Sequence, residues 1–394
     1  MQPLIPAIGE FAMTMRPAAL ANFALLSLLL VLCATSCTGG FDAATAAPRD
    51  GHLIAGRAAV VYSSRYEIDL GGLEKSHSFD IHKYGRMARA LVAEGYLKST
   101  DFYVPAEVTR EQLLLVHTPQ YLSTLGSSKA VSRYMESEAM KLLPAPLLDS
   151  GVLRAFRTST GGTILAARQA LVCGLGINLG GGYHHAHPDH GEGFCVYADV
   201  PIAVRVLQKE GLIRRVLLVD LDVHQGNGNA VCFAGDDDVF TFDIHEADIY
   251  PSPKAEADLN VPLVPPVDDQ RYLATLRQHL PDLLTRTRPD LVVVLGGVDT
   301  YRDDPLAHFD LSLEGIVTRD EYAVGEARRR NLPVLYVTSG GYSDMAWVIQ
   351  FRSIANLLVK FAGVVPTAPA AGATPGKSAP KGAGGKNSAE GKGS

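Results

Sequence analysis

The sequence predicts an α/β domain of three layers, in which helices cover both faces of a central, mostly parallel β-sheet. Short runs rich in Val, Ile and Leu recur across residues 55–363. Several of these runs are apolar almost throughout, as expected of strands that are buried on both faces. Helical patterns lie between the runs, and such alternation is typical of a doubly wound sheet. We therefore assign residues 55–363 to a single domain.

The individual elements follow from local composition. The first and fifth expected strands read Ala-Ala-Val-Val-Tyr and Leu-Val-Val-Val-Leu, and the second is followed at once by three glycines that mark a turn. In the expected helices, apolar residues recur every three or four positions. Strands are expected at residues 58–62, 176–179, 216–222, 239–244, 291–295 and 333–338. Helices are expected at residues 161–171, 200–208 and 269–284.

Composition narrows the class of protein. The chain has 394 residues, of which 47% are hydrophobic and 20% charged, so there is ample apolar material for a core. The 36 basic residues against 42 acidic ones give a net charge of -6, and a nucleic-acid partner is not expected without a basic face. Five cysteines in this length do not make a disulfide scaffold, and Cys173, Cys195 and Cys232 are expected to be free thiols.

The first 40 residues are predicted to be a targeting segment. No charged residue lies between Arg16 and Asp42, and the run is apolar before it ends in small residues. The small residues before Cys37 resemble a bacterial lipoprotein processing site, where that cysteine is lipidated. An uncleaved membrane anchor or a plain signal peptide is the alternative. We expect an exported, membrane-attached protein, with a cytoplasmic protein whose start is misplaced as the other possibility.

Two further segments lie outside the predicted domain. Residues 41–54 are expected to be a linker. Residues 364–394 consist mostly of Ala, Gly, Pro and Lys, and they lack the large apolar side chains that would offset the loss of chain entropy on folding. We expect a disordered tail there, with contact to anionic lipid or cell wall as the alternative.

Ligands of doubly wound sheets bind beyond the carboxyl ends of the strands, so the residues that follow each strand are candidates for a functional site. After the second strand, the glycines at 180–182 permit an irregular loop in which His184 and His185 face one pocket. A hydrogen-bonded structural pair is the alternative. His187 and His190 either extend a metal-binding tract or are loop residues beside a proline.

The other strand ends carry carboxylates, a histidine and a tyrosine. Alternation along an extended chain puts Asp220, Asp222 and His224 on one face. Burial of three ionisable groups is costly unless they are paired or bind a metal, and no basic partner lies within this run. Asp299 follows the fifth strand, and Tyr342 follows two glycines after the sixth.

Together these residues have the chemistry needed for metal-assisted hydrolysis of an amide. Asp222, His224 and Asp299 make three ligands and leave one position open, as in catalytic zinc sites. The two adjacent histidines then remain for proton transfer. Asp220 can orient a histidine, and Tyr342 can donate a hydrogen bond to a developing oxyanion.

The order and content of these motifs resemble the zinc-dependent histone deacetylase family, and most closely its class IV branch. The resemblance spans residues 62–358 and implies the arginase/deacetylase-like form of the three-layer fold. Besides the strand-end motifs, it rests on Gly72-Leu-Glu-Lys-Ser-His77-Ser-Phe-Asp80, Val116-His117-Thr-Pro-Gln-Tyr121-Leu122, Thr160-Gly-Gly-Thr163 and Gly193-Phe194-Cys195-Val-Tyr197-Ala-Asp199.

The resemblance implies a role for each candidate residue. The metal would be Zn²⁺, with Fe²⁺ as the alternative, because mixed nitrogen and oxygen ligands suit both. His185 would be the general base that activates water, and His184 would pair with Asp220 and act electrostatically or as an acid. Tyr342 would polarise the scissile carbonyl. The implied metal ligands are Asp222, His224 and Asp299.

Three further assignments come from the resemblance. Gly193 and Phe194 would line a narrow channel for the lysine stem. Asn227 stands where class I members have Asp, and a neutral amide there lowers the basicity of His185. A structural K⁺ ion would lie under the metal-binding strand. The residues that match its place are Asp220, Asp222, His224, Asp243 and Ile244.

The function implied is removal of acetyl or longer acyl groups from lysine side chains or similar amines. An exported enzyme would meet no histone, so acylated envelope proteins, peptides or polyamines are the expected substrates. Two alternatives stay open. A binuclear manganese ureohydrolase shares the architecture but needs further bridging carboxylates, and a membrane-tethered protein could bind an acyl chain or amine without turnover.

Overall fold

The computed structural model describes residues 58–68, 70, 72, 74 and 79–367. The chain divides into two compact units, Met1–Ala44 and Thr45–Ser394, and every described residue belongs to the second. The predictions for residues 1–40, Cys37, the linker at 41–54 and residues 368–394 therefore lie outside the described part. Within that part, no helix is long and apolar enough to cross a membrane.

Seven strands form one sheet in which every neighbouring pair is parallel, in the order β1-β2-β7-β6-β3-β4-β5. The prediction of a single parallel-sheet α/β domain is confirmed. All residues of β3, β6 and β7 are buried, which explains why their sequences are apolar without alternation. The strands are β1 (Ala59–Val61), β2 (Leu175–Asn178), β3 (Val216–Asp220), β4 (Val239–Glu246), β5 (Leu259–Leu263), β6 (Leu291–Leu295) and β7 (Val334–Val337).

Two strand predictions need correction. β3 ends at Asp220, so Asp222 and His224 lie in the loop that follows and not on the strand itself. The edge strand β5 was not expected from the sequence. It contains Pro262, and four of its five residues are not buried, so it lacks the apolar run that identified the inner strands.

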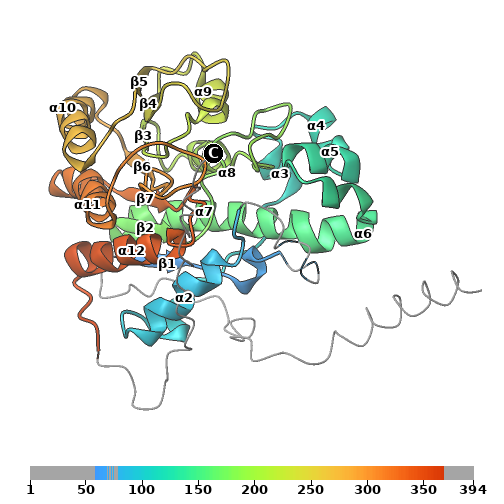
Figure 1. Ribbon diagram of the computed structural model, residues 1–394, viewed down its shortest axis with the longest axis horizontal. Helices are drawn as coiled ribbons and strands as arrows, with labels where there is room; N and C mark the ends of the chain where they lie inside the picture. Colours follow the sequence, from blue (N-terminus) through green and yellow to red (C-terminus); the bar gives the residue numbers. More distant parts are fainter. Residues whose placement is uncertain (1–57, 69, 71, 73, 75–78, 368–394) are drawn as a thin grey trace, which may run out of the picture. The chain divides into compact units, whose positions relative to one another are not determined.

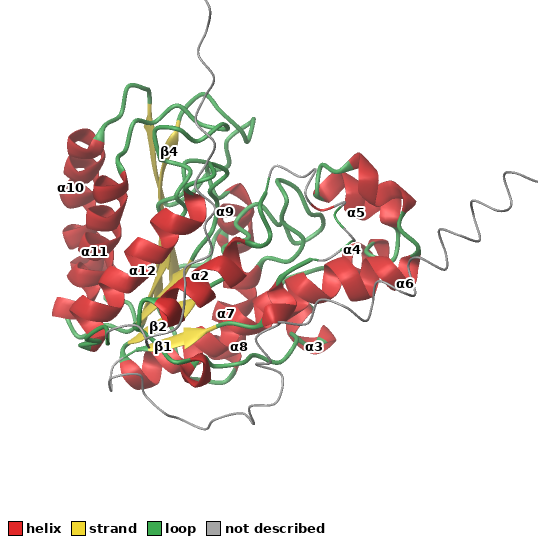
Figure 2. Cartoon of the chain, turned by 60° about the horizontal axis from the view of Figure 1, so that its bottom comes forward, coloured by secondary structure: helices red, strands yellow, loops and turns green. Residues whose placement is uncertain are grey.

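Helices pack on both faces of this sheet (Figure 1). Figure 2 shows α10 and α11 side by side on one side of the strands and α7 and α8 on the other. The helices are α2 (Lys83–Ala93), α3 (Arg110–Leu113), α4 (Pro119–Thr124), α5 (Ser128–Tyr134), α6 (Ala145–Leu147), α7 (Arg154–Cys173), α8 (Asp199–Lys209), α9 (Asn227–Phe233), α10 (Asp269–Thr287), α11 (Leu313–Arg329) and α12 (Ala346–Ala362). Short 3₁₀ turns lie at Ser64–Tyr66, Ser99–Asp101 and Glu138–Leu142, and a π-helical turn at Leu148–Leu153.

The helix ends have local causes in the sequence. Helix α10 starts where the Asp268 carboxylate accepts from the Arg271 N–H, and α11 starts where the Ser312 hydroxyl accepts from the Gly315 N–H. Helix α7 ends at Cys173, and the next residue, Gly174, has a φ of 90°, the left-handed conformation that commonly follows a helix. It is longer than the predicted 161–171, because a preceding helical turn carries the chain directly into Arg154.

The parallel arrangement brings the carboxyl ends of β2, β3, β6 and β7 to one edge of the sheet. The loops after these strands carry the candidate residues. Arg319 of α11 is fully buried there and ties two of the loops together. Its guanidinium donates to the carbonyl of Leu221 at 2.9 Å and to the carbonyl of Gly297 at 2.8 Å.

The cysteines in the described part of the chain are free thiols, as predicted. Cys173 and Cys195 are buried, and Cys232 is half-buried.

Candidate active site

Three side chains from two strand ends converge in the interior. Asp222 and Asp299 are fully buried, and His224 is 6% exposed. The His224 Nδ1 atom lies 3.4 Å from Asp222 Oδ1 and 3.2 Å from Asp299 Oδ2. One ligand atom from each residue lies within 4.8 Å of the other two. The structure therefore brings together the three residues expected to bind a metal.

Hydrogen bonds orient both carboxylates toward this point. Asp222 Oδ2 accepts from the Ser339 hydroxyl at 2.9 Å and from the Gly340 N–H at 2.8 Å. Asp299 Oδ1 accepts from the Val223 N–H at 2.9 Å. Each carboxylate thus keeps one oxygen directed at the imidazole. Such outer contacts fix ligand geometry before a metal binds.

The electrostatics of the group fit a cation. Burial and repulsion from Asp222 raise the pKa of Asp299 to about 7. Although burial opposes its charged form, hydrogen bonds to Asp222 and Asp299 raise the pKa of His224 to about 10. Two buried carboxylates beside one imidazole hold excess negative charge, which a divalent ion would neutralise. A set of two carboxylates and one imidazole suits Zn²⁺ or Fe²⁺.

His184 and His185 lie side by side next to these ligands, with ring centroids 4.0 Å apart. His184 Nδ1 is 3.0 Å from Asp220 Oδ2, and His185 Nδ1 is 2.7 Å from Asn227 Oδ1. Their partners differ in charge, so the two imidazoles differ in basicity. Although burial opposes the charge, Asp222 and Asp220 raise the pKa of His184 to about 9. Burial and the neighbouring imidazoles hold the pKa of His185 well below its usual range.

The loop before this pair is irregular, as the glycines predicted. Gly182 has a φ of 80°, and a Cβ atom there would lie 2.7 Å from the Ser339 Cα. The fully buried Asp199 carboxylate accepts from the Gly182 N–H at 2.9 Å and from the Tyr183 N–H at 2.8 Å. This contact from the start of α8 holds the loop in the shape that turns both histidines inward.

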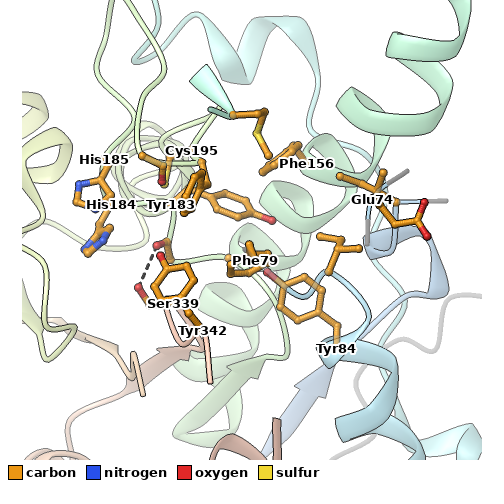
Figure 3. Close-up of a pocket in the computed structure, with 18 of the residues that line it drawn as sticks. Glu74, Phe79, Tyr84, Phe156, Tyr183, His184, His185, Cys195, Ser339 and Tyr342 are labelled. Carbon is orange, nitrogen blue, oxygen red and sulfur yellow. Dashed lines mark hydrogen bonds between the residues drawn. The ribbon is translucent and has the colours of Figure 1, made fainter. Parts of the chain in front are cut away.

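Tyr342 stands opposite the histidines. Its ring lies 6.0 Å from the ring of His224, and its backbone N–H donates to Asp304 Oδ2 at 2.8 Å. Burial and the charges of Asp299 and Asp222 hold the pKa of its phenol well above the usual range, so the group stays a proton donor. Figure 3 shows Tyr342, His184 and His185 at one end of a cavity that continues toward Phe156 and Glu74.

The cavity has a polar end and an apolar end. Gly193 and Phe194 line it as expected, and the Phe194 ring lies 5.9 Å from that of Tyr342. Gly193 has a φ of 53°, and a Cβ atom there would lie 2.6 Å from His185 Cδ2, so only glycine fits against this imidazole. The far end is mostly hydrocarbon. The apolar residues that line it are Ile68, Ile81, Met135, Met140 and Phe156.

The region assigned to a structural cation lies beneath the ligands. Asp220 pairs with Asp243 across β3 and β4, and Ile244 is the next residue along β4. The Asp243 carboxylate accepts from the Gly226 N–H at 2.8 Å, and its other oxygen lies 2.7 Å from His245 Nδ1. Both oxygens of Asp243 therefore already have partners within the protein.

Several residues that support the site were not identified from the sequence. They are Arg319, Asp199, Asp304 and Lys83. Lys83 is fully buried in α2, where its ammonium donates to the Ser339 carbonyl at 3.0 Å and lies 4.3 Å from the centroid of the Phe79 ring. Burial lowers its pKa to about 8. The available signal was a charged residue within an otherwise apolar helical face, which does not reveal its partner.

Comparison with known proteins agrees with this arrangement. Residues 77–357 match the family model described as histone deacetylase domain. The chain is 36% identical over 316 residues to histone deacetylase 2 of Arabidopsis thaliana, covering 79% of this chain and 81% of the relative. It is 29% identical over 265 residues to the acetoin utilization protein AcuC of Staphylococcus aureus, covering 60% and 66% of the two chains.

A solved structure shares the fold. The HD domain of HDA15 superimposes with a TM-score of 0.64 at 22% identity, covering 80% of this chain and 92% of that one. Fold and relatives together define a hydrolase of the deacetylase type. The chain belongs to the histone deacetylase family. This membership argues against the ureohydrolase and the binding protein without turnover, while assignment to the class IV branch stays a prediction.

Replacement of Asp299 by Asn should weaken metal binding and alter the pH dependence of stability. In the metal-free protein, a pKa raised to about 7 means that the folded state holds a proton which the unfolded state releases near pH 4. The free energy of unfolding should therefore fall as the pH rises from about 4 to about 7, and this Asp299 contribution should vanish in Asp299→Asn.

The measurement is thermal unfolding of chelated protein across that pH range, with bound metal quantified separately. The difference between the two proteins isolates Asp299 from the histidines that titrate nearby. An identical pH profile, or unchanged metal content in the variant, would contradict the role of Asp299.

Proposed function

We propose that this protein is a zinc-dependent deacylase that hydrolyses acylated lysine side chains or similar amines. The observation that carries the proposal is the convergence of Asp222, His224 and Asp299 beside two histidines of different basicity, at one end of an apolar cavity. Fe²⁺ is the alternative metal, because the same ligands suit it. An acetylated polyamine is the alternative substrate.

Asp222, His224 and Asp299 would hold the ion. When bound, Zn²⁺ polarises a carbonyl and increases the acidity of water. His185 is the base of the pair, because its low pKa keeps its Nε2 atom free to accept a proton at neutral pH. Asn227 holds the ring by accepting from Nδ1, which leaves Nε2 directed at the reaction.

The other two groups stabilise charge. His184 stays protonated beside Asp220 and lowers the energy of negative charge that develops on the substrate. The Tyr342 phenol donates a hydrogen bond to the carbonyl oxygen as it becomes an oxyanion. Return of a proton to the leaving amine falls to His185, once it has accepted one from water. Phe79 and Phe194, whose rings lie 6.1 Å and 5.9 Å from that of Tyr342, enclose the lysine stem.

The apolar end of the cavity favours acyl groups longer than acetyl. Met135, Met140 and Phe156 supply hydrocarbon contacts there, and each methylene buried contributes about 0.8 kcal/mol. Two methionines also let the lining adapt to chains of different length.

The test is release of amine from peptides with acyl-lysines from acetyl to myristoyl and from acetylated polyamines. The full-length chain in detergent is used, with and without a chelator. We expect chelator-sensitive hydrolysis that rises with acyl length. If only the acetylated substrates are hydrolysed, the expected preference for longer acyl groups is wrong. If protein that contains the metal ion releases no amine from any of these substrates, the proposed deacylase function is wrong.

We further propose that the enzyme is exported and held at a membrane through lipidated Cys37. The support is the uncharged run after Arg16 and the small residues that precede the cysteine. Cys37→Ser should lose incorporation of labelled fatty acid when produced in a bacterium, and the processed protein should leave the membrane fraction. Equal labelling of both proteins would exclude Cys37, and an unlabelled variant that stays in the membrane would indicate an uncleaved anchor.

A structural K⁺ ion remains part of the proposal. Its support is the resemblance of Asp220, Asp222, His224, Asp243 and Ile244 to the family's cation site, together with the pairing of Asp220 with Asp243 across β3 and β4. Such an ion would stabilise the loop after β3 that carries two of the metal ligands.

A further inference from the structure

A second group of metal-ligating side chains lies in the loop between β2 and α8. It consists of His187, His190 and Glu192, which we call the loop cluster. One ligand atom from each lies within 4.8 Å of the others, and among the described residues the only other such group is Asp222, His224 and Asp299. The deacylase mechanism proposed above does not use the loop cluster.

The potential ligand atoms of the loop cluster lie close together. The imidazoles of His187 and His190 are stacked, with centroids 4.2 Å apart and planes inclined by 11°. The Glu192 carboxylate spans both rings, with Oε1 3.2 Å from His187 Nε2 and Oε2 3.7 Å from His190 Nε2. The in-plane lone pairs of two parallel rings do not meet, so the partly exposed His190 ring must turn before both imidazoles reach one ion at the Zn²⁺ bond lengths of about 2.0–2.2 Å.

The backbone holds the two histidines in place. The His187 N–H donates to the His190 carbonyl at 2.9 Å and closes the turn between them. The His187 carbonyl lies 3.0 Å from His117 Nδ1, and the next carbonyl, that of Pro188, accepts from the Thr118 N–H at 2.8 Å. A site built on such a fixed turn loses little entropy when an ion binds.

The tautomer of His190 is also set for binding. Its Nδ1 atom lies 2.7 Å from Asp189 Oδ1, so this nitrogen carries the proton and Nε2 keeps its lone pair. Solvent reaches the cluster, since the side chains of His187, His190 and Glu192 are 13%, 41% and 31% exposed. An ion can therefore enter from solution and keep water in its remaining coordination position.

The loop cluster contacts the catalytic base through one residue. The Asn227 amide group donates to Glu192 Oε1 at 2.5 Å and lies 3.1 Å from His187 Nε2. The carbonyl oxygen of the same side chain accepts from His185 Nδ1. Asn227 thus connects the loop cluster to His185 by direct contacts.

We propose that the loop cluster is a second site for a borderline divalent ion such as Zn²⁺, and that its occupancy lowers turnover. An ion there takes the Glu192 oxygen that accepts from the Asn227 amide, so the amide is less polarised and its oxygen is a weaker acceptor for His185. The effect on turnover rests on the deacylase function proposed above, whereas ion binding does not.

The first experiment measures binding. The full-length chain is freed of metal and equilibrated with increasing Zn²⁺, and bound ions are counted after dialysis. We expect two ions in the wild type and one in His190→Ala and Glu192→Gln. His190 does not contact Asn227 directly, so its removal deletes a ligand and leaves the contact with the base. His308→Ala is the matched control, because His308 also lies beside a glutamate, Glu246, at 2.7 Å. It should bind two ions.

Binding of one ion by the wild type would overturn the proposal, as would retention of the second ion by both loop-cluster variants. Cobalt(II) provides a separate signature, because its visible absorption reports coordination directly. When the spectrum of His190→Ala is subtracted from that of the wild type, the difference should show the absorption of a second bound Co²⁺. A difference spectrum without such a band would count against the site.

The second experiment measures the ratio of rates with and without excess Zn²⁺. We expect a fall of about 10-fold in the wild type, the scale of weakening the one hydrogen bond by which Asn227 positions His185. The ratio should stay near one in His190→Ala. An unchanged wild-type ratio at full occupancy would overturn the coupling. Absence of deacylase activity in every condition would refute the proposed function, and the ion count would still decide the site.

Discussion

His185→Ala should lower turnover by about 10²–10⁴ while the protein still binds its metal, because general-base catalysis contributes on that scale. The imidazole lies beside the three residues proposed to bind the metal but is not one of them, and Asn227 rather than a carboxylate holds it. Its pKa is held low, so it is the member of the histidine pair that is free to take a proton at neutral pH. The measurement is kcat on the best acyl-lysine peptide together with metal content.

His184→Ala gives the comparison that separates the two histidines. His184 is paired with Asp220 and stays protonated, so its loss removes charge stabilisation but leaves the base. Turnover in this variant should fall less than in His185→Ala and should keep a similar acid limb of the pH profile. Loss of metal from His185→Ala, or an equal effect of both substitutions at every pH, would contradict the assigned roles.

Tyr342→Phe should lower kcat by about 10²–10³, the usual effect of removing an oxyanion donor. The phenol lines the cavity across from the histidines, and the phenylalanine keeps the ring contacts with Phe79 and Phe194. KM should therefore change little, because the hydrogen bond strengthens only as charge develops on the oxygen.

The measurement is kcat and KM of both Tyr342→Phe and the wild type, which shows which of the two constants changes. A variant with nearly normal kcat on a good substrate would show that the phenol does not stabilise the transition state. A large rise in KM with unchanged kcat would mean that Tyr342 binds the substrate without assisting the reaction.

The buried strands and the residues at their ends were visible in the sequence for a physical reason. Strands covered on both faces must be apolar throughout, so the charged and glycine-rich residues that follow them stand out. The same reasoning fails at the edge of the sheet. Strand β5 is only partly covered and contains Pro262, so it looks like a loop.

Helix α11, which was not expected from the sequence, shows a second limit. Arg319 lies on the buried face of α11, where its guanidinium binds the carbonyls of Leu221 and Gly297. A charged residue at this position weakens the amphipathic pattern by which a helix is predicted. Its partners are about a hundred and about twenty residues away, so no local pattern reveals them.

The sequence by itself determined the class of fold, the family resemblance and the set of reactive side chains, because these depend on local composition and order. Only the tertiary structure decided how those side chains differ. His184 and His185 are adjacent and chemically identical, and they acquire opposite pKa shifts. Burial lowers the pKa of both, but Asp222 and Asp220 outweigh it at His184, whereas the imidazoles of His184 and His224 add to it at His185. The loop cluster likewise exists only because a closed turn stacks two histidines over Glu192. Burial and the distance to neighbouring charges set the pKa of each side chain, and the order of residues does not reveal either of them.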